Sequence, residues 1–120
     1  MMGFTSAQRY YLSREAADMR KSYDGLSGLV RQGLGRDPLS GEVFIFLNRR
    51  RTMIKVLVWD RSGFVIWSKR LERGTFELPR SMEAGASVAL RWEELVMILE
   101  GVSLGSIQRR KRYSREKAAA

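Results

Sequence analysis

Three strand-like apolar runs follow one another in the middle of the chain, and they restrict its fold more than any other feature. They cover residues 42–48, 52–60 and 63–71. In the second run side chains alternate with a period of two, with Ile54, Val56 and Val58 on one face and Met53, Lys55, Leu57 and Trp59 on the other. The connections at residues 48–52 and 60–63 are of hairpin length. Strands joined by such short turns must run antiparallel, so the sequence predicts a meander.

A helix is expected on each side of this meander. Met19, Tyr23, Leu26, Val30 and Leu34 recur at spacings of three and four, which predicts one inward-facing apolar stripe. Asp18 stands where an N-cap residue is expected, and Gly33 and Gly35 stand where a helix would end. Gly25 and Gly28 lie inside the stripe, and close approach to a sheet would explain them. A second amphipathic helix is predicted for residues 92–100, ending at Gly101.

Three shorter runs complete the expected sheet. Residues 8–13 predict a first strand, residues 74–79 a short edge strand ended by Pro79, and residues 87–90 a brief last strand. The predicted fold class is therefore α+β: a small antiparallel β-sheet of four or five strands, with the first helix on one face, a short C-terminal helix and a basic tail. We expect one domain over residues 1–106 and a disordered tail over residues 107–120.

Composition excludes most kinds of active site. The chain has no cysteine and no histidine, so it cannot form disulfides, thiolate metal sites or histidine-based catalytic groups. Each aspartate has a structural explanation: Asp18 as a cap, Asp24 as a partner of Arg20, and Asp37 and Asp60 as turn residues. We therefore predict no enzymatic activity, no cofactor and no small-molecule substrate.

The chain has neither a signal-peptide pattern nor an apolar stretch long enough to span a membrane. We therefore expect a cytoplasmic location and no membrane partner.

The charge of the chain points to a polyanionic partner, with DNA the expected one. The net charge is +9, and arginine predominates among the cations. Arg49, Arg50 and Arg51, here called the arginine triplet, fall at the tip of a predicted hairpin, where they can reach several phosphates. In the basic tail (residues 107–120), Arg109, Arg110, Lys111 and Arg112 predict a cationic arm. Solvation of a turn and a solubilising tail are the structural alternatives.

Other cations give weaker predictions. Lys69, Arg70 and Arg73 form a second basic group, although Lys69 and Arg70 must point to opposite faces of a strand. Lys55 lies among apolar residues and marks a candidate open face of the sheet. With Trp59 and Trp67 it would form a stacking surface for bases, unless these tryptophans belong to the core.

Several separated blocks resemble a known family. They are "DMRKSYDGLSGLV", "LGRDPLSGEVFIF" and "IKVLVWDRSGFVIWSKRLERGTF", and the matching positions are residues 18–21, 23–26, 54–55, 59–60, 63–64, 69–72, 74 and 76. They resemble the TnpB-type accessory proteins encoded by the second open reading frame of the bacterial insertion-sequence sixty-six group. The resemblance covers residues 9–104 and leaves the basic tail outside. Ser22 departs from it, since a glycine is common there.

The resemblance implies a role beside a larger transposase that carries the catalytic acidic residues. Together with the charge, it predicts a non-catalytic accessory protein for transposition that binds DNA through the arginine triplet and the basic tail. A protein adapter for the transposase, or for another element-encoded protein, is the first alternative. A small RNA-binding module that uses the two tryptophans is the second.

Overall fold

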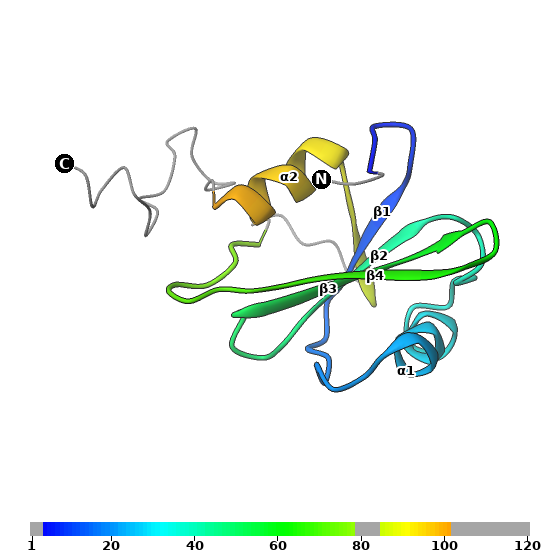
Figure 1. Ribbon diagram of the computed structural model, residues 1–120, viewed down its shortest axis with the longest axis horizontal. Coiled ribbons are helices and arrows are strands. Elements are labelled where there is room, and N and C mark those ends of the chain that lie inside the picture. Colours follow the sequence, from blue (N-terminus) through cyan, green and yellow to red (C-terminus); the bar gives the residue numbers. More distant parts are fainter. Residues whose placement is uncertain (1–3, 79–84, 102–120) are drawn as a thin grey trace.

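The computed structural model describes residues 4–78 and 85–101. It contains one five-stranded sheet, with helix α1 on one face and helix α2 on the other (Figure 1). Along the chain the elements are β1 (Tyr10–Ser13), α1 (Tyr23–Gly28), a π-helical turn η1 (Leu29–Gly33), β2 (Val43–Leu47), β3 (Met53–Asp60), β4 (Gly63–Arg70), β5 (Ser87–Leu90) and α2 (Trp92–Glu100). The α+β class is confirmed, as are the meander, the last strand and the C-terminal helix.

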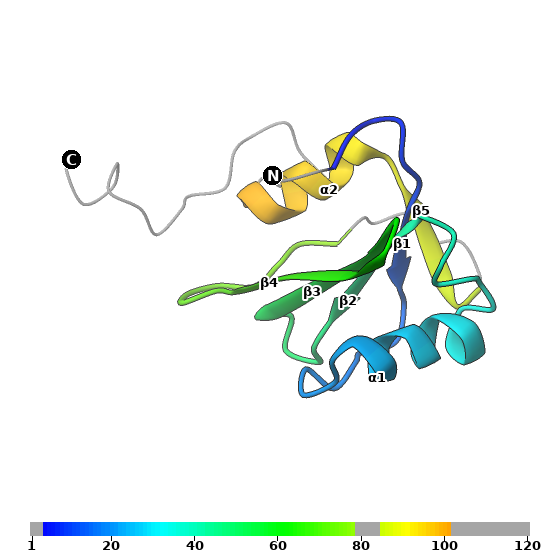
Figure 2. The same ribbon diagram turned by 45° about the vertical axis from the view of Figure 1, so that its right-hand side comes forward.

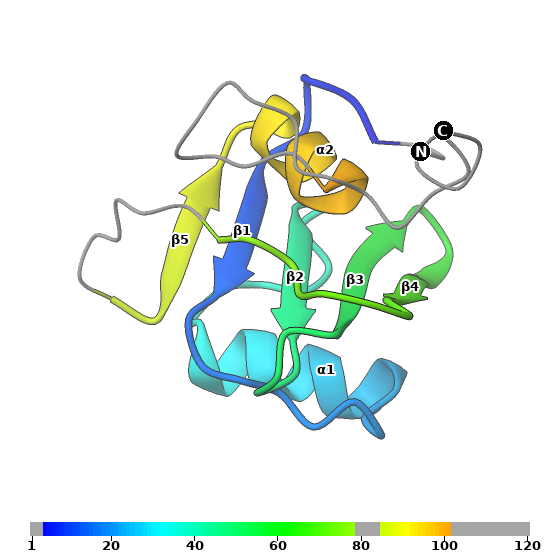
Figure 3. The same ribbon diagram turned by 90° about the vertical axis from the view of Figure 1, so that its left-hand side faces the viewer.

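The strands lie in the order β4-β3-β2-β1-β5, which Figure 3 shows from one end. The hairpins are antiparallel as predicted, with Val43 paired to Val58 and Met53 to Arg70. One pairing was not expected: β1 runs parallel to β2. The chain between these two strands carries α1 and η1 and crosses the sheet, so it returns in the same direction. The sheet is therefore mixed.

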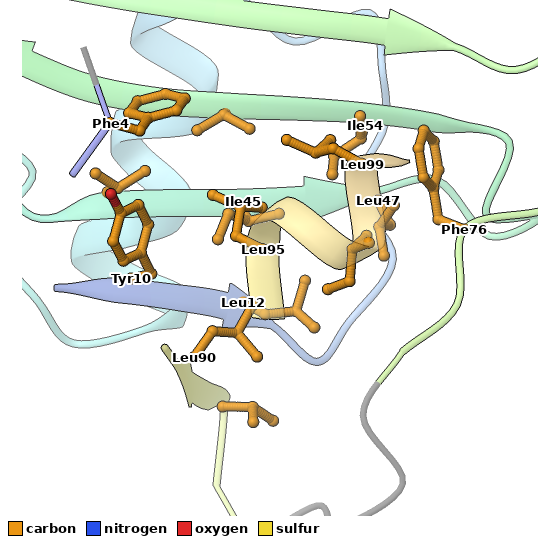
Figure 4. Close-up of a cluster of buried hydrophobic side chains, with 14 residues drawn as sticks. Phe4, Tyr10, Leu12, Ile45, Leu47, Ile54, Phe76, Leu90, Leu95 and Leu99 are labelled. Atoms are coloured by element: carbon orange, nitrogen blue, oxygen red, sulfur yellow. The ribbon is translucent and has the colours of Figure 1, made fainter. Parts of the chain in front are cut away.

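Fourteen buried residues fill the space between the sheet and α2 (Figure 4). We call them the α2-face cluster: Phe4, Tyr10, Leu12, Val43, Ile45, Leu47, Ile54, Val56, Phe76, Val88, Leu90, Leu95, Ile98 and Leu99. The polar end of Tyr10 is satisfied, because its hydroxyl donates to the Thr5 carbonyl at 2.6 Å. The alternation in β3 predicted one face made of Ile54, Val56 and Val58, and this face packs into the cluster.

The opposite face of the sheet has its own core, the α1-face cluster of Leu26, Val30, Phe44, Phe46 and Leu57. Strand β2 contributes to both clusters, and all five of its residues are buried. A strand covered on both faces needs no polar alternation, which explains the continuous apolar sequence "VFIFL".

The first helix begins later than predicted, at Tyr23, so Asp18 is not its N-cap. The Asp18 carboxylate instead accepts the Arg20 backbone N–H at 2.9 Å and pairs with the Arg20 guanidinium at 2.8 Å. This local turn competes with helix formation. Arg20 therefore pairs with Asp18 and not with its predicted partner Asp24. Leu26 and Val30 pack inward as expected, but Tyr23 is 47% exposed.

The glycines inside the helix do not mark a close approach to the sheet. A Cβ atom at Gly28 would meet nothing within 4 Å, and the three atoms nearest to one at Gly25 all belong to the Lys21 side chain. The end of the helix was predicted correctly: the Leu34 N–H donates to the Leu29 carbonyl at 3.0 Å, and Gly35 follows with a φ of +64°. Gly101 ends α2 with a φ of 82°.

Residues 74–78 do not form the predicted edge strand. Gly74 turns the chain with a φ of 74°, and Phe76 then enters the α2-face cluster. Burying this aromatic ring requires the segment to cross the end of the sheet instead of lying along its edge. Pro79, the predicted domain boundary at 106 and the basic tail lie outside the described residues.

Candidate nucleic-acid interface

The arginine triplet lies in the connection between β2 and β3, and the Asn48 side chain holds that connection closed. Asn48 Oδ1 accepts the N–H groups of Thr52 at 2.9 Å and Met53 at 3.0 Å, and the Asn48 carbonyl accepts the Arg51 N–H at 3.0 Å. All three arginines are exposed, and Arg51 has a φ of 58°. The side chains therefore project from a backbone that is already fixed.

The second basic group comes to the same end of the sheet. The Leu71 N–H donates to the Thr52 carbonyl and the Phe76 N–H to the Arg51 carbonyl, each at 2.8 Å. The chain that follows β4 is thus hydrogen-bonded to the arginine loop, and Figure 2 shows this chain turning at the left-hand end of the sheet. Arg70 and Arg73, both exposed, flank the arginine triplet through this arrangement.

The charges at this end are only partly neutralised. Arg70 lies 3.4 Å from the Glu72 carboxylate, and both side chains are exposed. Arg20 pairs with Asp18, whose pKa is lowered to about 2 mainly by the side-chain hydrogen bond from Arg20. Within residues 4–78 and 85–101, no carboxylate forms an ion pair with a member of the arginine triplet. The triplet is therefore a concentrated positive charge that no carboxylate of the described residues pairs with.

Two lysines of the predicted interface have contacts within the fold. Lys69 Nζ donates to the Leu99 carbonyl at the end of α2 at 3.0 Å, and Lys55 Nζ donates to the Lys21 carbonyl before α1 at 2.8 Å. The prediction of an open face at Lys55 is wrong, because α1 and its cluster cover that face. Lys69 and Arg70 do point to opposite faces, as their spacing predicted.

The two tryptophans lie on opposite faces of the sheet. Trp59 packs edge-to-face on Phe64, with ring centroids 5.1 Å apart, beside the α1-face cluster. Trp67 packs against the α2-face cluster. They cannot form one platform for bases, so the structure removes the shared stacking surface on which the RNA-binding alternative depended.

The acidic residues that the structure describes do not gather at one place. Asp37 accepts the Leu39 N–H at 2.9 Å, and the Asp60 carbonyl accepts the Ser62 N–H, so both are turn residues as predicted. A groove of about 580 Å³ beside η1 has Glu15 as its single acidic lining residue. Among the described residues no three side chains form a group that could hold a metal ion.

Comparisons with known proteins agree with the resemblance found in the sequence. The family model described as "IS66 Orf2 like protein" matches residues 8–109. The chain belongs to the IS66 Orf2-like family. Two relatives come from Sinorhizobium fredii. "Uncharacterized protein y4jC" is 27% identical, over 92% of each chain, and "Uncharacterized protein y4hO" is 34% identical, over 78% of this chain and 80% of the relative. No solved structure matches the chain significantly.

Membership of the IS66 Orf2-like family supports an accessory role in transposition. The family match includes the arginine triplet and ends at Arg109, so residues 110–120 lie beyond it. Within the described part of the chain, no helix is long and apolar enough to cross a membrane.

One polar cluster in this IS66 Orf2-like protein has no recognisable signal in the sequence. The Arg36 guanidinium lies 3.9 Å from the centre of the Tyr11 ring and donates two hydrogen bonds to Glu42, each 3.0 Å long. These bonds lower the pKa of Glu42 and raise that of Arg36. Tyr11 and Arg36 are far apart in the chain, so no local spacing could predict their contact.

Proposed function

We propose that this protein is a non-catalytic accessory factor of transposition that binds DNA through the arginine triplet and the basic tail. The observation that carries the proposal is the fixed loop with three exposed guanidinium groups and no ion-pair partner among the described residues. The family supplies the setting in transposition. Catalysis is then the task of the transposase, at or near the ends of the element.

The loop suits phosphate binding for two physical reasons. Arginine donates two parallel hydrogen bonds to a phosphate, and several arginines side by side can neutralise neighbouring phosphates. Because Asn48 already fixes the backbone, less loop entropy is lost when DNA binds. A hairpin of this width can also enter the major groove.

The contacts of two lysines support a smaller interface than charge alone suggested. Lys55 and Lys69 hold helix ends, so we assign them no contact with DNA. Arg70 and Arg73 flank the loop and add to its field. Arg109, Arg110, Lys111 and Arg112 in the basic tail would supply sequence-independent attraction to phosphate.

A salt titration with a matched control tests the role of the loop. Binding to duplex DNA with the terminal inverted repeats is followed by fluorescence polarisation between about 50 and 200 mM salt. One variant carries Arg49→Ala, Arg50→Ala and Arg51→Gly. The control carries Arg9→Ala, Arg31→Ala and Arg61→Gly, which removes three exposed arginines away from this end. Glycine replaces the one arginine of each set that has a positive φ.

We expect the first variant to bind more weakly and to reduce the slope of log affinity against log salt by up to about 2.7, at about 0.9 per phosphate lost. The control should keep most of the affinity and slope. Equal losses in the two variants would show that only net charge matters. Absence of binding by the unaltered protein at low salt would refute the proposal.

A chain ending at residue 106 tests the tail separately. We expect it to bind DNA more weakly while keeping its sensitivity to the arginine-triplet substitutions. If the shortened chain is insensitive to them, the loop is not a DNA-binding element.

A further inference from the structure

Within the described residues, strand β4 forms an open edge of the sheet. All eight of its residues, Gly63 to Arg70, pair in unbroken register with β3 on one side, and no described strand pairs on the other. Every second residue of such a strand directs its N–H and C=O groups outward, where they can accept another strand. The opposite edge, β5, has four residues and offers a shorter site.

The middle of this edge lacks the features that normally prevent pairing. Residues 64–68 include no charged residue and no proline, and the strand has no bulge. Val65 is 41% exposed although it is large and apolar, and Trp67 is only partly buried on the same face. The cations Lys69 and Arg70 stand at one end only.

We propose that β4 pairs antiparallel with β4 of a second copy of this chain, about a two-fold axis through Ile66. Residues directly opposite each other in antiparallel strands have their side chains on the same face of the sheet. A two-fold axis perpendicular to the sheet must therefore lie midway between the two copies of one residue. At Ile66 it sets Val65 opposite Trp67 of the second copy and Phe64 opposite Ser68. Val65 and Trp67 then form a β-branched–aromatic pair, which is favourable across strands.

Charge also favours this occupant and this register. Lys69 lies opposite Gly63 of the second copy, which has no side chain and pairs with the exposed Asp60 within its own sheet. Lys69 and Asp60 of the second copy thus lie on the same face of the joined sheet and in line across its strands, so their opposite charges attract. The cationic ends of the two strands lie at opposite ends of the contact and do not face each other. An axis at Trp67 would instead set Val65 opposite Lys69.

Such a dimer would have one continuous sheet of ten strands, five from each copy. Its two arginine triplets would lie at opposite ends of that sheet and outside the contact. Dimerisation can therefore fail while DNA binding by the loop persists, and the reverse also holds.

A pair of lysine variants tests the contact in the full chain. Val65→Lys puts a charge in the middle of the edge, and Leu39→Lys makes the same change at a loop residue of similar exposure, 44%. Sedimentation is measured over a range of protein concentrations in about 0.5 M salt, which releases bound nucleic acid. We expect Val65→Lys to raise the dimer dissociation constant at least about tenfold, or about 1.4 kcal/mol, and Leu39→Lys to leave it unchanged. A monomeric unaltered protein, or equal weakening in both variants, would overturn the proposal.

Cysteine cross-linking tests the register, because the native sequence contains no cysteine. Ile66→Cys places two thiols opposite each other at the axis, within reach of a disulfide. Ser68→Cys places each thiol opposite Phe64 of the second copy. Mild oxidation should give a covalent dimer with the first variant and much less with the second. Equal cross-linking of the two variants would rule out pairing about Ile66. The absence of cross-linking in a dimeric sample of Ile66→Cys would rule it out as well.

Discussion

The Asn48 carboxamide binds Thr52 through both of its polar atoms, donating to the Thr52 hydroxyl at 3.1 Å and accepting the Thr52 N–H at 2.9 Å. One side chain therefore closes the loop on which the arginine triplet stands. The triplet supplies the charge of the candidate interface, and Asn48 supplies its shape. Substitutions at five positions test these and the other polar contacts.

Asn48→Ala should lower the free energy of unfolding by about 1–3 kcal/mol, because two backbone N–H groups lose their acceptor. Urea unfolding measures the change. Asn48→Asp keeps an acceptor oxygen and should cost less. If alanine and aspartate cost the same, the accepted N–H bonds are not what stabilises the loop.

Glu42 should make stability fall in acid. Its pKa in the folded chain is lowered, first of all by the hydrogen bonds from Arg36, so the pair stabilises the fold above the unfolded pKa of about 4.3. This contribution is lost as the pH falls through the lower folded value. Urea midpoints at pH 7 and pH 3 should therefore differ less in Glu42→Gln than in the unaltered chain.

Asp18→Asn is the comparison for that experiment. The pKa of Asp18 is also lowered, to about 2, but its ion pair with Arg20 is exposed and screened by water. We expect this variant to keep nearly all of its stability at pH 7. A larger loss there than in Glu42→Gln would contradict the ranking of the two pairs.

Arg36→Lys should lower the free energy of unfolding by about 1 kcal/mol, since lysine cannot donate the paired hydrogen bonds and stacks less well on an aromatic ring. The ring of Tyr11 and the carboxylate of Glu42 both lose their partner. Thermal unfolding of Arg36→Lys and Arg36→Ala shows the effect. A lysine variant as stable as the native chain would mean that charge alone suffices.

Lys69→Ala should separate stability from DNA binding. The loss of the bond to the Leu99 carbonyl should cost about 0.5–1.5 kcal/mol. The affinity for DNA should change much less than in the arginine-triplet variant. A large loss of affinity with unchanged stability would instead put Lys69 in the interface.

Local patterns predicted the parts of the fold that depend on local chemistry. The alternation at Ile54, Val56 and Val58 gave β3 both of its faces, and the short turns gave the meander. Asp18 has the chemistry of an N-cap, but its contact with Arg20 turned the chain before the helix could start. The segment around Phe76 looks like an edge strand until the core that buries its ring is known.

In the candidate site, too, local patterns predicted one part and missed another. Turn spacing sufficed to put the arginine triplet at a hairpin tip. The roles of Lys55 and Lys69 depend on carbonyl groups 34 and 30 residues away along the chain, at the ends of helices packed on opposite faces. No local pattern carries that information. The intramolecular contacts of the two lysines therefore became visible only in the tertiary structure.

The pairing of β1 with β5 has a consequence for synthesis on the ribosome. Tyr10 lies opposite Leu90, so the chain must be made through residue 90 before these two residues can meet. The β2–β3–β4 hairpins need only nearby residues and can form early, whereas closing so long a loop costs more entropy. A chain stopped before residue 87 would leave β1 as an unprotected edge, so the nascent sheet is complete only after residue 90 has been made.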